Sequence, residues 1–267
     1  MQSAIKRTSQ RVFPRGALDA VRQLALFACC YVGYQIVRGL VDGSQSTAFW
    51  NATKVIELES SLSIFVEPAV QTWTRGNDLL IGFADWMYLN SHYLVTFSAL
   101  AFIYIRRNSS FYFVRNMFLI AMGLALVGYA LYPTAPPRLM PEWGFTDTLA
   151  LATGTRVDNE QASALLNLYA AVPSMHVCFS LMIGASMLTL TNRVWARVIW
   201  ACYPLTVTWV VVVTGNHYLF DALLGAVTAG IAWLGANRLG AARDGWRFRP
   251  NSPVPSKREQ ALAEAVA

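Results

Sequence analysis

Residues 195–238 read WARVIWACYPLTVTWVVVVTGNHYLFDALLGAVTAGIAWLGANR. Two apolar runs in this stretch, 195–214 and 218–238, each hold the roughly 20 residues that a helix needs to cross the hydrocarbon core of a bilayer. Only the tripeptide Gly-Asn-His separates them. A helix satisfies its own backbone hydrogen bonds in lipid, and so short a connection makes the second helix return beside the first. The stretch therefore predicts a helical hairpin in a membrane.

Four more apolar segments of similar length precede this hairpin along the chain. They cover residues 18–38, 82–105, 112–133 and 172–190. We therefore predict an all-α, polytopic membrane protein with six transmembrane helices. Because six is an even number, both ends of the chain are expected on the same side of the membrane.

The composition agrees with this fold class. Hydrophobic residues make up 55% of the 267 residues and charged residues 13%, whereas a soluble domain is about 45–50% apolar and about 25% charged. The net charge of +6 comes from basic residues grouped between the apolar runs, which argues against disorder and against nucleic-acid binding. Cys29, Cys30, Cys178 and Cys202 lie inside apolar runs without metal-ligand spacing, and we interpret them as small core residues.

The distribution of Lys and Arg predicts the orientation. Sixteen of the 21 basic residues lie on the side of the chain ends and five on the other side. The sixteen fall in residues 1–22, 106–115 and 191–197 and from Arg238 onward. Basic residues in short loops favour the cytoplasm, so we expect cytoplasmic termini in a bacterial cytoplasmic (inner) membrane. Residues 1–240 are predicted to form the membrane domain, and residues 241–267 a polar, flexible cytoplasmic tail.

Two outward connections are too long to be simple turns. In the first, residues 42–80, apolar side chains recur near helical spacing, which predicts outward interfacial helices between the first two spans. A plain surface loop is the alternative there. The second, residues 135–171, is rich in proline and aromatic residues and then becomes polar, which suggests a lid.

Three polar motifs fall at the outward ends of predicted spans. YPTAPPR (132–138) follows the third span, PSMH (173–176) opens the fourth, and GNHYLFD (215–221) opens the sixth. Ionisable groups close to a membrane span are costly and usually functional. Helix counting alone therefore brings an arginine, two histidines and an aspartate to one face.

These residue types suit phosphoryl transfer. Asp221 lies four residues after His217, which would place the two side chains one helical turn apart, so the carboxylate can orient the imidazole as a nucleophile. His176 is suited to protonate a leaving oxygen and later to deprotonate an acceptor. Ser174 is positioned to cap the fourth span, and the amides of that helix start together with Arg138 would bind phosphoryl oxygens.

Other interpretations of the histidines were weighed. His92, in the second predicted span, is interpreted as a packing or hydrogen-bonding residue. Two histidines and a carboxylate also form a facial metal triad in some enzymes. Arg138 beside them would repel a cation and suits an anion better, so we predict neither a metal nor another cofactor.

At these motifs the chain resembles the phosphatidic acid phosphatase type 2 superfamily, and more closely its inositol phosphorylceramide synthase (aureobasidin-resistance) branch. The resemblance spans most of the chain and includes APPR (135–138), PSMH (173–176), HYLFD (217–221) and the segment Asn51 to Glu59 with its IELE. It implies a six-helix, metal-independent membrane enzyme. It also implies that His217 is the nucleophile, Asp221 its orienting partner and His176 the general acid and base.

The chain departs from the phosphatase pattern at two expected cations. Leu131 stands where the phosphatases usually carry a lysine, and Val210-Val211 stand where they carry Ser-Arg. These departures favour a lipid phosphotransferase over a phosphatase of small phosphomonoesters. Four residues are candidates to complete the substrate pocket: Lys54, Tyr132, Asn216 and Tyr218.

The predicted function is therefore a membrane lipid phosphotransferase or phosphatase with a phosphohistidine intermediate. It would move a phosphoryl or phospho-alcohol group, such as inositol phosphate, from a lipid donor to inositol, a lipid alcohol or water on the extracytoplasmic side. The first alternative is a polyprenyl or phospholipid phosphate phosphatase that uses the same residues with water as acceptor. The second is a non-enzymatic protein that binds an anionic lipid.

Overall fold

The fold is known from a computed structural model, which describes residues 12–40, 44–154 and 168–250. Within these residues the chain is helical, and the only β-type pairing is an isolated bridge between Thr134 and Ala170. The long helices are α2 (Ala17–Leu40), α3 (Gln45–Ser61), α5 (Asp78–Arg106), α6 (Asn108–Leu131), α9 (Met175–Leu190), α10 (Val194–Val213) and α11 (Leu219–Ala242). The shorter ones are α4 (Glu67–Arg75), α7 (Thr148–Thr153), η1 (Pro137–Leu139), η2 (Pro141–Trp143) and η3 (Asp244–Trp246).

Among the described residues, four helices are long and apolar enough to cross a membrane. They are α2, α6, α10 and α11. The predicted second and fourth spans correspond to α5, which is 29 residues long and carries charges at both ends, and to α9, an apolar helix of 16 residues. The all-helical membrane architecture is therefore supported, and the count of six spans stays a prediction.

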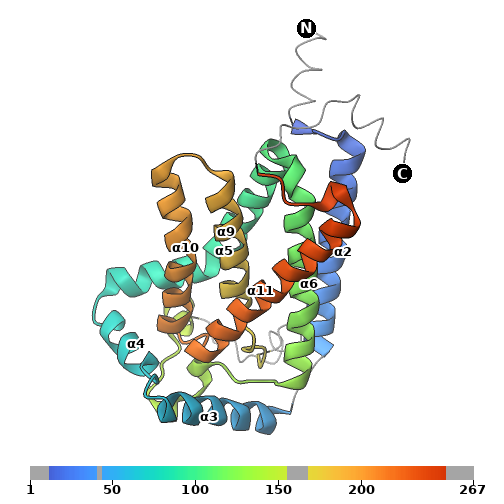
Figure 1. The fold of residues 1–267 in the computed structure, drawn as a ribbon. Coiled ribbons are helices and arrows are strands. Elements are labelled where there is room, and N and C mark those ends of the chain that lie inside the picture. Colours follow the sequence, from blue (N-terminus) through green and yellow to red (C-terminus); the bar gives the residue numbers. More distant parts are fainter. Residues whose placement is uncertain (1–11, 41–43, 155–167, 251–267) are drawn as a thin grey trace.

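The long helices other than α3 alternate in direction along the chain, so their ends form two groups (Figure 1). At one end the described parts of the two chain termini lie together: Tyr104 donates to Asp19 over 2.9 Å, and Ser109 donates to the carbonyl of Arg249 over 3.1 Å. At the other end lie the last turns of α6 and α10 and the first turns of α9 and α11, with α3 placed across them. All three polar motifs are therefore at the end opposite the termini.

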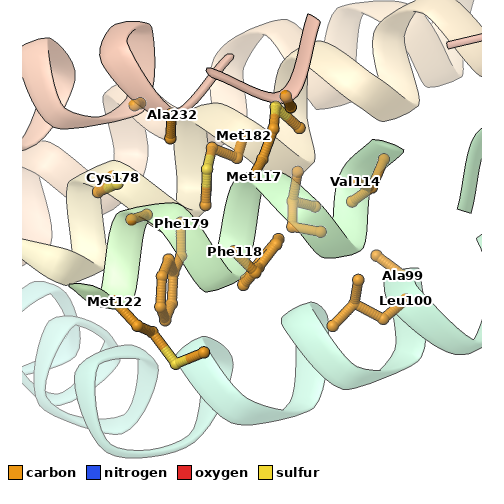
Figure 2. Packing of buried hydrophobic residues seen from close by; sticks show 14 of the residues in the cluster. Ala99, Leu100, Val114, Met117, Phe118, Met122, Cys178, Phe179, Met182 and Ala232 are labelled. Atoms are coloured by element: carbon orange, nitrogen blue, oxygen red, sulfur yellow. The ribbon is translucent and has the colours of Figure 1, made fainter. Parts of the chain in front are cut away.

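The core of the bundle forms around α9, which packs against α5, α6, α10 and α11. Figure 2 shows part of this core, where side chains of α5, α6, α9 and α11 face one another. The labelled residues include Leu100, Met117, Phe118, Cys178, Phe179 and Met182. Cys178 is buried as predicted for a core residue, and all four cysteines are free thiols, although Cys29 and Cys202 are exposed.

The chain after α11 stays close to the bundle as far as Pro250. The Phe248 ring lies 5.3 Å from the Phe113 ring between centroids, and the backbone N–H of Arg249 donates to the Ser110 hydroxyl over 3.0 Å. The predicted flexible tail starts at residue 241. Residues 241 and 242 are the end of α11, and residues 243–250 form the segment that stays close to the bundle. The rest of that prediction, residues 251–267, lies outside the described residues, as do residues 155–167 of the predicted lid.

One glycine allows α9 to start directly against α11. A Cβ atom at Gly225 would lie 2.4 Å from the backbone oxygen of Ser174, a distance that no side chain tolerates without a shift. The N–H of Ser174 also donates to the carbonyl of Asp221 over 3.0 Å. This close approach fixes the start of α9 relative to the start of α11.

We expect Gly225→Ala to destabilise the protein by about 1–3 kcal/mol, because overpacking displaces a helix start. Gly230→Ala in the same helix is the matched control, since nothing lies within 4 Å of its Cβ position. Alanine favours a helix over glycine by up to about 1 kcal/mol, so the control should be neutral or stabilising. Thermal unfolding of the two purified variants in detergent measures the difference, and equal effects would contradict this account.

Candidate active site

His217 and Asp221 form the centre of the site. Helix α10 ends at Val213, the chain turns through Gly215 with φ of +68°, and α11 begins at Leu219. The Nδ1 atom of His217 lies 3.3 Å from Oδ2 of Asp221, and the exposed fractions of the two residues are 6% and 0%. Asp221 thus orients the imidazole from a buried position.

The predicted pairing is found, but its local geometry differs from the prediction. His217 precedes α11, so the two residues do not share a helical face one turn apart. Asp221 is instead the third residue of the helix and also accepts the backbone N–H of Tyr218 over 3.0 Å. The carboxylate therefore caps the helix and orients His217 at the same time.

His176 belongs to the first turn of α9. Ser174 caps this helix, as predicted, because its hydroxyl accepts the N–H of Val177 over 3.4 Å. The imidazole of His176 lies 5.8 Å from that of His217 between ring centroids. It is stacked against Tyr88 at 4.6 Å and lies 4.3 Å from His92, so aromatic side chains of α5 hold its position.

Arg138 reaches the same site from η1. Its backbone N–H donates to the carbonyl of Gly215 over 2.7 Å, and its guanidinium donates to the side-chain oxygen of Asn216. Asp147 is 3.9 Å from the guanidinium. The arginine is therefore fixed to the turn that carries His217, and its charge is partly balanced.

A polar cavity of about 120 Å³ joins these groups. Arg138, His176, Asn216 and His217 line it, together with a set of tyrosines from three helices and His92. The tyrosines are Tyr31, Tyr34, Tyr88, Tyr93 and Tyr129. The sequence prediction missed the tyrosines, because they come from apolar helices in which a tyrosine is usually a packing residue.

Three predicted pocket residues do not line this cavity. Lys54 has 42% of its side chain exposed, forms an ion pair with Glu57 at 2.6 Å and lies over the Trp50 ring. Tyr132 is partly buried, and Tyr218 is fully buried in a separate apolar cluster. The structure thus brings together the predicted catalytic residues and Asn216, but not these three side chains.

A glutamine absent from the prediction supports the loop around His217. Gln71 of α4 is buried, and its amide donates to the carbonyls of Thr146 and Val213 over 3.0 and 3.1 Å. Its side-chain oxygen accepts the N–H of Thr146 over 2.9 Å. It thereby links α4 and the loop before α7 to the last turn of α10.

The arrangement of these groups is suited to anion binding and nucleophilic attack. With Nδ1 of His217 directed at Asp221, Nε2 is the ring nitrogen on the opposite edge and is suited to attack. Arg138 and the start of α9 supply positive potential for an anion. Among the described residues, no group of three or more His, Cys, Asp or Glu side chains has the arrangement of a metal site.

Comparison with known protein families matches the chain to one superfamily over most of its length. The family model of the PAP2 superfamily matches residues 53–235, which includes every predicted site residue. No curated protein and no solved structure matches the chain.

Proposed function

The chain belongs to the PAP2 superfamily of lipid phosphatases and phosphotransferases, and from this premise we propose that it transfers a phosphoryl or phospho-alcohol group through a phosphohistidine on His217. The observation that carries the proposal is the meeting of His217, His176 and Arg138 at one cavity, with the buried Asp221 carboxylate behind His217. A protein that only binds an anionic lipid would not need a buried carboxylate to orient one of the imidazoles.

The reaction has two steps of similar geometry. In the first, Nε2 of His217 attacks phosphorus, the bond from phosphorus to the lipid oxygen breaks, and His176 protonates that oxygen. Arg138 and the amides at the start of α9 hold the phosphoryl oxygens. In the second, His176 takes a proton from the acceptor hydroxyl, whose oxygen attacks phosphorus and releases His217. Asp221 stabilises the imidazolium in both steps.

An apolar groove beside the cavity supports a lipid substrate. The groove has a volume of about 320 Å³ and is lined by α2, α5, α6 and α9. It shares Tyr31, His92, Tyr93 and Phe179 with the polar cavity. A phosphorylated headgroup in the cavity would therefore place its hydrocarbon chain in the groove.

The groove predicts that a substitution inside it affects lipid substrates and spares water-soluble ones. Thr96→Trp fills the groove from α5 and should lower kcat/KM for a long-chain lipid donor by about tenfold, or ~1.4 kcal/mol. A water-soluble phosphate ester should be unaffected. Leu94→Trp is the matched control, because Leu94 is exposed on the same helix and is not a groove residue. An equal loss with both substrates would contradict a lipid chain in the groove.

The proposed topology follows the sequence prediction. We propose six spans, with α5 and α9 as the second and fourth, and α3 and α4 as the interfacial helices. The termini would be cytoplasmic and the site extracytoplasmic, in the inner membrane. The antiparallel arrangement supports this topology, because the site and the described chain ends are at opposite ends of the bundle.

The acceptor can be decided by product analysis. The purified protein is incubated with a phospholipid or polyprenyl phosphate donor, with and without inositol or a lipid alcohol. A new phosphodiester that appears only with the alcohol identifies a transferase, whereas release of the headgroup in water identifies a phosphatase. Leu131 and Val211 stand at positions where the phosphatases usually carry a lysine and an arginine. The absence of these two cations favours a transferase of the inositol phosphorylceramide synthase type. The activity should survive excess chelator, because the proposed mechanism uses no metal. If the protein binds the lipid donor but forms no product, only the lipid-binding alternative is left.

A further inference from the structure

Two buried glutamates meet the start of α11 directly behind the site. Glu59 is in the last turn of α3 and Glu67 is the first residue of α4, and their exposed fractions are 1% and 0%. Glu59 Oε1 accepts the N–H of Phe220 over 2.7 Å, and Glu67 Oε1 accepts the N–H of Leu219 over 3.0 Å. These are the first two N–H groups of the helix that carries Asp221.

The remaining carboxyl oxygens have no donor. Oε2 of Glu59 and Oε2 of Glu67 are buried without a hydrogen-bond partner when both groups are ionised. Among the described residues, neither carboxylate forms an ion pair with a basic side chain. Burying two adjacent ionised carboxylates without a cation carries a large free-energy cost, so both groups cannot stay ionised together. One proton shared between them would satisfy both oxygens.

We propose that Glu59 and Glu67 are a proton-sharing acid pair that positions the start of α11, and with it His217 and Asp221, for phosphoryl transfer. They act through the helix start and do not touch the reacting atoms, so they are positioning residues. This inference rests on the proposed function for its catalytic part. The existence of the acid pair does not depend on that function, because it is inferred from the burial of the two glutamates and from their hydrogen bonds to the start of α11.

The surroundings of the pair are acidic. Burial and the adjacent Glu67 carboxyl raise the pKa of Glu59 to about 9, and Asp221 adds a further repulsion. The groups that face this cluster are Glu67 from α4, Asp221 and Tyr218 from α11, and Glu142 from η2. The positive end of the α11 dipole favours one negative charge on the pair, whereas a second charge would add to that of Asp221.

The shared proton links stability to pH. A glutamate in the unfolded chain has a pKa near the ordinary 4.5, whereas folded Glu59 keeps its proton up to about pH 9. Between these values the folded state binds more protons, so the free energy of unfolding falls as pH rises. The contribution is fully present below pH 4.5 and is lost by about pH 9. The stability that the pair contributes therefore declines across the range from about pH 4.5 to about pH 9.

Glu59→Gln tests the proposal because an amide imitates the protonated acid. Its oxygen can still accept the N–H of Phe220 and its NH₂ group can donate to Glu67, so we expect kcat within about threefold of wild type at neutral pH. In wild type, ionisation of Glu59 near pH 9 should disturb the start of α11 and lower kcat. This alkaline decline should disappear in Glu59→Gln, because the amide cannot ionise. Glu59→Ala and Glu67→Ala should lower kcat about 100-fold with KM changed less than threefold.

Glu57→Gln is the matched control, because Glu57 is two residues earlier in α3 and is 52% exposed at its side chain. It should keep the wild-type pH profile. The proposal is overturned if Glu59→Gln keeps the alkaline decline, or if it loses as much kcat as Glu59→Ala.

Infrared spectroscopy separates this proposal from the proposed function. The spectrum of wild type minus that of Glu59→Gln should contain a protonated carboxyl band at neutral pH that is lost near pH 9. Absence of the band overturns the acid pair whatever the activity is. A wild-type chain that shows the band but no phosphoryl transfer would overturn the proposed function and the positioning role, and would leave the shared proton in place.

Discussion

His217→Ala should reduce turnover at least about 10⁴-fold and abolish labelling of the protein by a ³²P-phosphoryl donor. The nucleophile forms the bond that replaces the lipid ester, so its removal takes away the covalent step. Rapid acid-free quenching followed by gel electrophoresis measures the label. A phosphoramidate on histidine is labile in acid and stable in alkali, which distinguishes it from a phosphoserine or an acyl phosphate.

The control for this variant is Asp221→Asn, which keeps the size of the buried side chain. Its amide can donate to His217 where the carboxylate accepts, so the imidazole is held in the wrong tautomer and turnover falls steeply. Labelling should become slow but should still occur on His217. Substantial turnover in His217→Ala, or label that survives this substitution, would refute the nucleophile assignment.

The sequence predicted which side chains lie together where the relevant spacing is short. Pro173 to His176 and His217 to Asp221 are compact motifs, and the antiparallel order of the helices brings them to one end of the bundle. The pairing of His217 with Asp221 was expected from helix periodicity. The structure achieves it through a helix cap, which the same four-residue spacing also permits.

Contacts between distant segments could not be predicted in the same way. Glu59 and Glu67 bind backbone groups 161 and 152 residues further along the chain. Nothing in a local pattern indicates which helix start a buried carboxylate will cap. For the same reason Lys54 was a reasonable pocket candidate by charge, although it pairs with Glu57 at the surface of α3.

The predicted spans illustrate a related limit. Length and hydropathy select α2, α6, α10 and α11 as helices that could cross a membrane. Helix α5 begins at Asp78 and also contains Asp85, whose carboxylate accepts the Thr148 hydroxyl over 2.7 Å. A polar residue that pairs with a neighbouring helix, as Asp85 does with the first residue of α7, lowers the mean hydropathy of its own helix even when that helix packs within the bundle. Hydropathy alone therefore does not count the spans.

His176→Ala should have the second largest effect and should separate the two chemical steps. With a lipid donor, whose alkoxide leaving group needs a proton, kcat should fall by about 10²–10⁴. With a nitrophenyl phosphodiester, which leaves without protonation, formation of the intermediate should stay fast. Its breakdown still requires deprotonation of the acceptor, so phosphohistidine should accumulate in this variant, and a burst of nitrophenolate should precede slow turnover.

The geometry explains why His176 affects both directions of proton transfer. Its ring is stacked on Tyr88 and lies 5.8 Å between centroids from the His217 ring, close enough for one phosphoryl group to lie between the two imidazoles. The double variant His176→Ala/His217→Ala must give neither burst nor label, which shows that the burst depends on His217. If His176→Ala slows both donors equally and no label accumulates, His176 only binds the phosphoryl group, and the acid and base must be sought among the other groups of the cavity.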